Sequence, residues 1–278
     1  MSTFKRGIAL AGGGARGAYQ IGALKALHKH GYLDDLHAIS GVSVGSLNAC
    51  LLAMGDLDIA EEIWLNLKED SLFDKDTSWK DLLIKENVHL ITDGIFKTDK
   101  LETIMDEVLD YDIIRKKQVF IAVSFVTEKK FKFTDALAIN IKNFFEKEKR
   151  IKYHDLRELS DDDIRGTLLA SCAIPVMFKP INIHGKTYYD GGILDNTPYT
   201  PLIQAGCDEV IVIDLFRISL RNVTRKKEID GTKMKYIYPK KNLHGVMDFS
   251  TDHIKARFEQ GYHDALETIE TWQKETET

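Results

Sequence analysis

Two short apolar segments near the start of the chain each run through glycines directly into a helical pattern. The first, RGIALAG (6–12), leads through AGGGARG into a helix that we predict over 17–31. The second, LHAISG (36–41), leads through GVSVG into a helix that we predict over 46–55. Buried strands that alternate with helices are typical of a mostly parallel sheet covered on both faces. This alternation predicts an α/β fold.

The rest of the chain extends the pattern. Further helices are predicted over 58–67, 99–109, 161–175 and 249–272. Strands are predicted over 118–127 and 208–215, and the strand over 118–127 has an expected hairpin partner over 129–134. A further hairpin is predicted over 181–192. Residues 70–97 have weak periodicity and are either a packed connection or a cap over a pocket. Residues 217–247 carry basic and polar clusters, and we expect a loop or extended excursion there.

Composition restricts the class of protein. The 278 residues carry a net charge of −5, which gives no reason to expect nucleic acid as a partner. The cysteines Cys50, Cys172 and Cys207 are odd in number and far apart, so we expect buried reduced thiols rather than disulfides or a metal site. The N-terminus lacks a signal-peptide pattern, and no segment approaches the roughly 18 apolar residues that span a bilayer. We therefore expect a cytoplasmic protein; the sequence leaves its oligomeric state open.

The motif GVSVG places Ser43 between Gly41 and Gly45, after a strand and before a helix. A nucleophile elbow has this pattern, because its sharp turn requires small residues on both sides of the serine. The turn presents the hydroxyl at the carboxyl end of the sheet and points the next backbone amide, that of Val44, into the same space. The alternative is a serine that only caps the following helix.

The loop AGGGARG is compatible with two functions. Gly12, Gly14 and Gly17 match the dinucleotide-binding pattern GxGxxG, but the sequence has no acidic residue at the end of the second strand and no P-loop lysine. Alternatively, the backbone amides of Gly12, Gly13 and Gly14 face a developing negative charge as an oxyanion hole. Arg16 then supports the loop or adds positive charge, unless it is an ordinary exposed cation.

Ser43 needs a base, and the sequence offers two candidates. His244 lies on a late glycine-containing loop, KNLHGVMD, where a Ser-His-Asp triad could place its histidine. Asp190 ends a predicted strand in YYDGG, where Gly191 and Gly192 remove steric bulk beside its carboxylate. A desolvated aspartate with a raised pKa can accept a proton directly from serine. Asp190 is the stronger candidate, and a simple turn aspartate is the alternative.

The motifs GGGARG, GVSVG and DGG stand in this order, and together they resemble the patatin-like phospholipase family in its bacterial, single-domain form. The resemblance extends to ASCAIPVMFKP (170–180), DNTPYTPLIQAG (195–206) and the late QGYHDAL, and it is clearest over 7–214. It implies a three-layer α/β/α sandwich with a mainly parallel central sheet. We expect one such domain over 1–278, in which 215–278 contribute a loop and a C-terminal amphipathic helix packed on the core.

The resemblance also implies a function. Ser43 would be the nucleophile and Asp190 its base in a Ser-Asp dyad, while Gly12–Gly14 and Arg16 would form or support the oxyanion hole. The substrate would be a lipid or other acyl ester, hydrolysed in the manner of a phospholipase A or lysophospholipase without a metal or organic cofactor. An acyltransferase that shares the same acyl-enzyme and a catalytically idle, lipid-binding regulatory scaffold are the alternatives.

Contact with a membrane surface is a further expectation. The stretch INIKNFFEKEKRIK (139–152) sets Phe144 and Phe145 among lysines, which predicts weak contact with an anionic bilayer, such as the inner face of the membrane. The alternative is a solvated basic helix anchored by its two aromatics. The apolar residues of 70–97 are candidates for an acyl groove, with ordinary core packing as their alternative.

Overall fold

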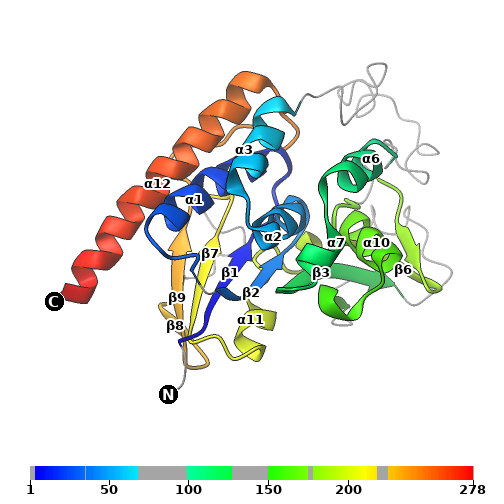
Figure 1. Ribbon diagram of the computed structural model, residues 1–278, viewed down its shortest axis with the longest axis horizontal. Coiled ribbons are helices and arrows are strands. Elements are labelled where there is room, and N and C mark those ends of the chain that lie inside the picture. Colours follow the sequence, from blue (N-terminus) through cyan, green and yellow to red (C-terminus); the bar gives the residue numbers. More distant parts are fainter. Residues whose placement is uncertain are drawn as a thin grey trace, which may run out of the picture.

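Strands from between residues 6 and 237 form a central β-sheet, with helices packed against it (Figure 1). This computed structural model describes residues 4–34, 36–67, 99–126, 150–174, 178–217 and 225–277. The strands are β1 (Arg6–Leu10), β2 (Leu36–Gly41), β3 (Gln118–Val126), β4 (Ile151–Asp155), β5 (Ile181–Ile183), β6 (Lys186–Asp190), β7 (Glu209–Ile213), β8 (Glu228–Ile229) and β9 (Thr232–Ile237).

The sheet is parallel at its centre and antiparallel toward its edges. Strands β3, β2, β1, β7 and β9 are neighbours in this order and all run parallel, whereas β4, β5, β6 and β8 pair in the antiparallel sense. The two strands that precede the glycine motifs, β1 and β2, lie side by side in the middle. Their burial on both faces explains why their sequences are almost continuously apolar.

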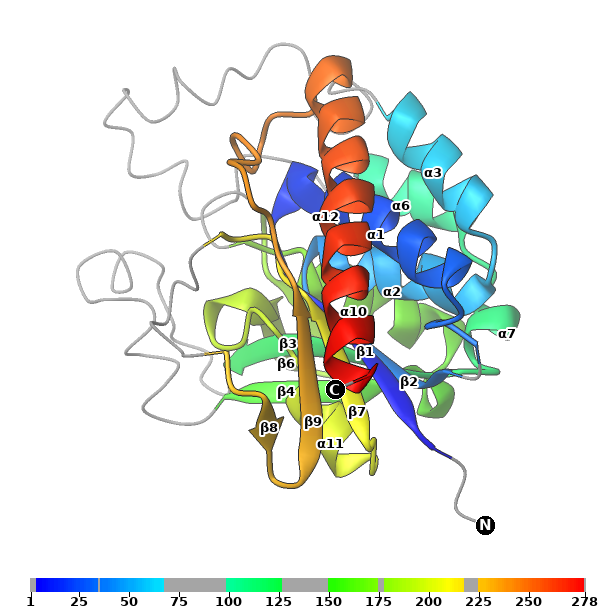
Figure 2. The same cartoon turned by 90° about the vertical axis from the view of Figure 1, so that its left-hand side faces the viewer.

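Helices cover the two faces of the sheet (Figure 2). The helices are α1 (Gly17–Lys29), α2 (Val44–Met54), α3 (Leu57–Asn66), α6 (Asp99–Val108), α7 (Tyr111–Ile114), α10 (Asp161–Ser171), α11 (Thr200–Gln204) and α12 (Thr251–Glu277), with 3₁₀-helices η1 (Gly14–Arg16), η3 (Leu156–Glu158) and η4 (Gly191–Ile193). Because side chains alternate along a strand, Ile8 and Ile211 pack with α1, α2 and α12, whereas Ala9 and Val210 pack with Leu202 of α11. The fold is the predicted α/β sandwich with a mainly parallel sheet.

The long C-terminal helix α12 packs on α1. The backbones approach so closely that a Cβ on Gly22 of α1 would overlap with the carbonyl of Phe258, and one on Gly261 would overlap with that of Tyr19. The buried inner residues of α12, Ile254, Ala265 and Ile269, belong to the same core as β1 and β7. The predicted amphipathic helix is therefore present, and it extends to Glu277.

Strands β2 and β6 lie on the same edge of β3. Ile121 of β3 pairs with Gly41, the last residue of β2, on one side and with β4 on the other. Val123 pairs with Asp190, the last residue of β6, on one side and again with β4 on the other. Since β2 runs parallel and β6 antiparallel to β3, their carboxyl ends meet beside Ala122. This junction brings two of the glycine motifs together.

Several expectations need correction. Residues 217–247 are not only a loop, because β8 and β9 lie there and β9 extends the parallel sheet next to β7. The five-residue helix α11 was not predicted. Of the stretch 139–152, only the last three residues are described; Arg150 is buried and the next two begin β4, so a basic helix does not extend to this end. The remainder, the expected hairpin partner at 129–134 and the segment 70–97 lie outside the described residues.

The turn from β2 into α2 gives the first testable prediction. A Cβ on Gly45 would overlap with the backbone carbonyl of Leu10 and lie 2.6 Å from that of Ala11, so Gly45→Ala must push β1 and α2 apart. We expect this variant to lose about 1–3 kcal/mol or more of unfolding free energy. The control is Gly166→Ala in α10, whose Cβ meets only the Ile183 side chain at 3.3 Å; it should change stability by less than about 1 kcal/mol. Urea unfolding of both variants checks this, and equal effects would contradict it.

Candidate active site

Ser43 occupies the sharp turn between β2 and α2. Its backbone angles are φ 53° and ψ −132°, which a residue with a side chain adopts at a cost of about 1–3 kcal/mol. Ser43 stands at the N-cap of α2, yet its side chain makes no capping hydrogen bond. The alternative of a simple helix cap is therefore wrong, because the hydroxyl of Ser43 is not used to cap α2.

Ser171, the last residue of α10, fixes the elbow. Its hydroxyl accepts a hydrogen bond from the Ser43 amide at 2.9 Å and donates one to the carbonyl of Ala122 at 2.8 Å. Ala122 is the β3 residue beside which β2 and β6 end. The side chain of Ser171 thus connects the elbow to β3 at the junction where the two strands diverge.

Asp190, at the end of β6, is buried and lies against Ser43. Burial raises the pKa of its carboxyl from 3.8 to about 7, while hydrogen bonds from the Gly192 amide and the Ser43 side chain oppose this rise. The Gly192 amide donates to Oδ1 at 2.7 Å. Asp190 is 5% exposed, so its carboxyl has little access to water.

His244 lies in different surroundings. It is exposed, and its ring stacks on that of His253 with 4.2 Å between the centroids. Ser43 instead interacts with Asp190, where it is one of the groups that lower the pKa of the carboxyl. Of the two candidate bases, the structure brings Asp190 to the serine.

Asn196 joins the DGG motif to the glycine loop. Its Nδ2 donates to the carbonyl of Gly12 at 3.1 Å, and its own carbonyl accepts from the Gly12 amide at 3.3 Å. Its Oδ1 occupies the space where a Cβ on Gly12 or Gly192 would lie, at 2.6 Å and 2.8 Å respectively. The neighbouring Gly191 is required for a different reason, because a Cβ there would overlap with the carbonyl of Ala122.

The glycine loop leaves some of its amides available. The Gly12 amide, which we expected among the oxyanion donors, already donates to Asn196. Gly13 and Gly14 have no acceptor for their amides among the residues that the structure describes. The amide of Val44, in the first turn of α2, is likewise unpaired within the described chain. The donors that remain are thus Gly13, Gly14 and Val44.

Arg16 supports this loop from outside. Its Nε and Nη2 donate to the carbonyl of His244, the former at 2.9 Å, and its guanidinium lies 4.8 Å from the ring of Phe216. Its Nη1 is 3.4 Å from the carbonyl of Leu215. Burial lowers the pKa of the guanidinium below its usual value. Through these contacts, Arg16 connects the glycine loop to the segments that contain Leu215 and His244.

Arg257 of α12 makes a similar contact from the interior. The residue is 1% exposed, and its Nε donates to the carbonyl of Leu243 at 2.7 Å. Its other nitrogens donate to the carbonyls of Gly245, Asp248 and, at 3.2 Å, Ala15 of the glycine loop. We call residues 243–248 the strap, because two arginines hold its carbonyls against the glycine loop.

A buried hydrogen-bonded chain supports the glycine loop from the side of α2. The indole of Trp64 donates to Asn48 Oδ1 at 2.8 Å, and Asn48 Nδ2 donates to Gln20 at 2.8 Å and to the carbonyl of Gly17 at 3.0 Å. Gln20 in turn donates to the carbonyl of Ala11 at 2.8 Å. Ala11 and Gly17 flank the glycine loop, so this network fixes both of its ends.

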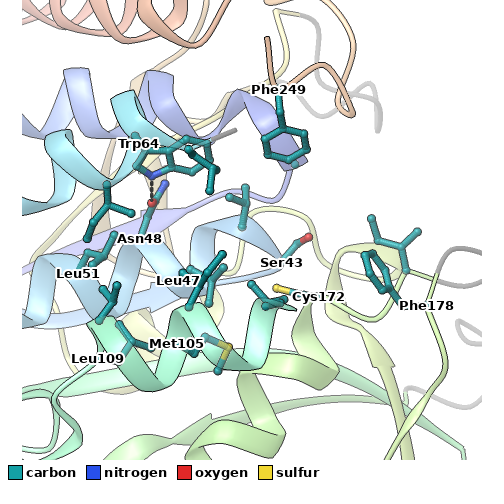
Figure 3. A pocket seen from close by; sticks show the side chains of 18 of the residues that line it. Ser43, Leu47, Asn48, Leu51, Trp64, Met105, Leu109, Cys172, Phe178 and Phe249 are labelled. Carbon is teal, nitrogen blue, oxygen red and sulfur yellow. Dashed lines mark hydrogen bonds between the residues drawn. The ribbon is translucent and has the colours of Figure 1, made fainter. Parts of the chain in front are cut away.

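An apolar cavity of about 140 Å³ opens beside Ser43 (Figure 3). Helices α2, α3 and α6 form much of its wall, and Met247 of the strap and the adjacent Phe249 also line it. Its lining residues are Gly14, Ser43, Val44, Leu47, Asn48, Leu51, Ile63, Trp64, Leu67, Leu101, Ile104, Met105, Val108, Leu109, Cys172, Ile174, Phe178, Met247 and Phe249. Cys172 is partly exposed here, whereas Cys50 and Cys207 are buried, and all three are free thiols. Such a cavity accepts an apolar chain whose end reaches the serine.

Sequence reasoning did not find Ser171, Asn196, Arg257 or the pair Gln20 and Asn48. Ser171 and Asn196 lie in the segments ASCAIP and DNTPY, which contributed only to the family resemblance. Proximity to the glycine motifs DGG and GVSVG was the available signal for Asn196 and Asn48. Arg257 had none, because its partner Ala15 is 242 residues away.

The sequence matches the patatin-like phospholipase family over residues 8–203. The chain belongs to this family. An uncharacterized NTE family protein of Mycobacterium tuberculosis is 29% identical over 209 residues, which cover 75% of this chain and 48% of the relative. A probable lipid hydrolase of Invertebrate iridescent virus 6 is 29% identical over 202 residues, covering 69% of this chain and 61% of the relative. The chain therefore spans only about half to three fifths of the length of these relatives.

A solved structure shares the patatin fold of this chain. The crystal structure of VipD from Legionella pneumophila superposes with a TM-score of 0.58, covering 97% of this chain and 67% of VipD. The two sequences are 15% identical, so this likeness concerns the fold alone. None of the helices in the described part of the chain has the length and apolarity needed to cross a membrane.

The burial of Asp190 predicts an unusual dependence of stability on pH. Because its pKa rises from 3.8 to about 7 on folding, the folded state retains a proton that the unfolded state releases between these values. The contribution of this carboxyl to the unfolding free energy therefore falls as the pH rises from about 4 to about 7. Asp190→Asn removes this penalty, so the variant should be more stable than the unaltered protein at pH 8, by up to about 4 kcal/mol.

Urea unfolding of both proteins at pH 5 and pH 8 measures this effect. The stability advantage of the Asp190→Asn variant should shrink as the pH falls toward 4. A stability difference that is equal at both pH values, or a variant that is less stable at pH 8, would contradict the raised pKa.

Proposed function

We propose that this patatin-like protein is a serine lipid acyl hydrolase in which Ser43 is the nucleophile and Asp190 its base. The observation that carries the proposal is that Ser43, which lines an apolar cavity, interacts with the buried carboxyl of Asp190. A serine hydroxyl is a weak nucleophile until a neighbouring group accepts its proton. Asp190 is the group in position to do so.

The first half of the reaction forms an acyl-enzyme. Asp190 accepts the hydroxyl proton as Ser43 Oγ bonds to the ester carbonyl carbon, whose oxygen becomes an oxyanion. The amides of Gly13, Gly14 and Val44 donate hydrogen bonds to that oxygen; one such donor typically stabilises the transition state by about 3 kcal/mol. The bond to the alcohol or lysolipid then breaks, and the leaving oxygen takes the proton from Asp190.

The second half releases the fatty acid. Water enters where the alcohol left, Asp190 accepts one of its protons, and the hydroxide oxygen bonds to the acyl carbon. When the Ser43–acyl bond breaks, the proton returns from Asp190 to Ser43 Oγ. Each bond that forms is balanced by one that breaks, and no metal or organic cofactor takes part.

The electrostatics of Asp190 suit this role. A general base works best when its pKa lies near the operating pH, and an exposed carboxylate is too weak a base for a serine. Burial raises the pKa of Asp190 to about 7, which makes the carboxylate more basic while leaving it ionised above neutral pH. A single buried aspartate thereby does the work that a histidine does in a triad.

The cavity and the comparisons support a lipid as the substrate. Among the described residues, the wall beside Ser43 is almost wholly apolar, and the one amide side chain in this part of it, Asn48, is hydrogen-bonded to Trp64, Gln20 and Gly17. An apolar chain gains from burial in such a wall, whereas a sugar or peptide would lose hydrogen bonds there. The viral relative is named a probable lipid hydrolase. The bond cleaved is therefore a carboxylic ester that carries an acyl chain.

Hydrolysis of p-nitrophenyl butyrate by the purified protein and three variants tests the proposal. Ser43→Ala and Asp190→Asn should each lower kcat by about 10³-fold or more, since each removes half of the reacting pair. His244→Ala is the matched control, because its ring is exposed and stacks on His253, and it should retain activity.

The outcomes separate the alternatives. Loss of activity in His244→Ala but not in Asp190→Asn would mean that the base is a histidine. No hydrolysis by the unaltered protein would favour the idle scaffold. Product that appears as a new ester when an alcohol is added would favour acyl transfer.

A further inference from the structure

We propose that the cavity beside Ser43 selects acyl chains of medium length, about eight carbons, and that Leu51 of α2 sets this length. The inference rests on the proposed function and names the class of substrate that the site would take. It follows from the dimensions of the cavity and from the rigidity of its walls.

The cavity follows one face of α2 for two helical turns. Its α2 lining residues, Val44, Leu47, Asn48 and Leu51, are spaced as i, i+3, i+4 and i+7, which places them in one stripe. At a rise of 1.5 Å per residue, Leu51 lies about 10 Å along the helix from Val44. Figure 3 shows Ser43 at one end of this row of side chains and Leu51 at the other.

Helix α6 repeats the same stripe on the facing wall. Leu101, Ile104, Met105 and Val108 have the same spacing and also span two turns. Leu109, directly after α6, lies with Leu51 at the end of the row away from Ser43 (Figure 3). The two helices thus enclose a channel of the same length on both sides.

Two independent measures give the capacity of this channel. An extended chain advances about 1.2 Å per single bond, as an extended polypeptide does over three bonds per residue, so about 10 Å accommodates eight or nine bonds. The cavity volume of about 140 Å³ is close to that of an engineered cavity of about 150 Å³ that binds benzene, a molecule with six carbons. Both measures correspond to a medium-length chain rather than one of sixteen or eighteen carbons.

The wall is held rigidly, so it does not simply widen for a longer chain. Trp64 is fixed by its hydrogen bond to Asn48, which is itself bonded to Gln20 and Gly17, and all of these residues are buried. Moving Trp64 away from the cavity would leave buried polar groups unpaired. A chain that exceeds the channel must therefore leave its last carbons outside it or clash with Leu51.

Chain-length profiles test the inference. We would measure kcat/KM for p-nitrophenyl esters with acyl chains of two to sixteen carbons, below the concentrations at which they form micelles. Each methylene that enters the cavity should raise kcat/KM about fourfold. We expect this rise to stop near eight carbons and kcat/KM to stay level or fall beyond them.

Leu51→Ala should move the maximum to longer chains by two or more carbons. The matched control is Leu52→Ala: Leu52 is the next residue of α2 and is 7% exposed against 6% for Leu51, but it does not line the cavity. The control loses a comparable core contact and should keep the original maximum. Leu109→Ala opens the same end of the cavity from outside α2, so it provides a second test should Leu51→Ala fail to fold.

The results distinguish this inference from the function on which it rests. Continued increase of kcat/KM up to sixteen carbons, or the same shift in Leu52→Ala as in Leu51→Ala, would overturn the chain-length proposal and leave the hydrolase intact. Absence of hydrolysis at every chain length, with the unaltered protein and its variants folded, would overturn both.

Discussion

The site depends on the arrangement of two strands on one edge of β3. Strand β2 arrives from one direction and β6 from the other, and they end beside Ala122. Ser171 fills the junction by bonding both to the carbonyl of Ala122 and to the amide of Ser43. Because the two strands end next to each other, the turn after β2 and the last residue of β6 are brought together. The contact between Ser43 and Asp190 is therefore a consequence of sheet topology.

The same convergence explains the concentration of glycines. The glycine loop and the DGG motif pack against Asn196 at close range. Its Oδ1 lies where Cβ atoms on Gly12 and Gly192 would otherwise be. The strap and its buried Arg257 then hold the glycine loop from the far side. The result is a preorganised set of backbone amides, whose orientation was settled when the protein folded. Preorganised donors of this kind stabilise a developing charge without the cost of reorientation.

Local patterns predicted the centre of the fold and the residues of the elbow, because β1, β2 and α2 are specified by short runs of sequence. Strand β9 was missed because Lys233 and Lys235 interrupt its apolar residues, although Thr232 and Met234, two residues apart, are both buried, as the alternation of a strand requires. Contacts such as that between Asn196 and Gly12, 184 residues apart, could not be read from local sequence. The pocket was likewise beyond reach, since its wall combines the consecutive helices α2 and α3 with α6 and with residues as distant as Cys172 and Phe249.

Labelling by a fluorophosphonate tests, without the need for a substrate, whether buried Asp190 activates Ser43 directly. The rate of labelling, followed by peptide mass spectrometry at Ser43, should rise with pH through about 7, because the carboxylate can accept a proton only once it has lost its own. In Asp190→Asn the rate should be low at every pH. Labelling of Ser43 in that variant at the rate of the unaltered protein, with the same dependence on pH, would contradict the account.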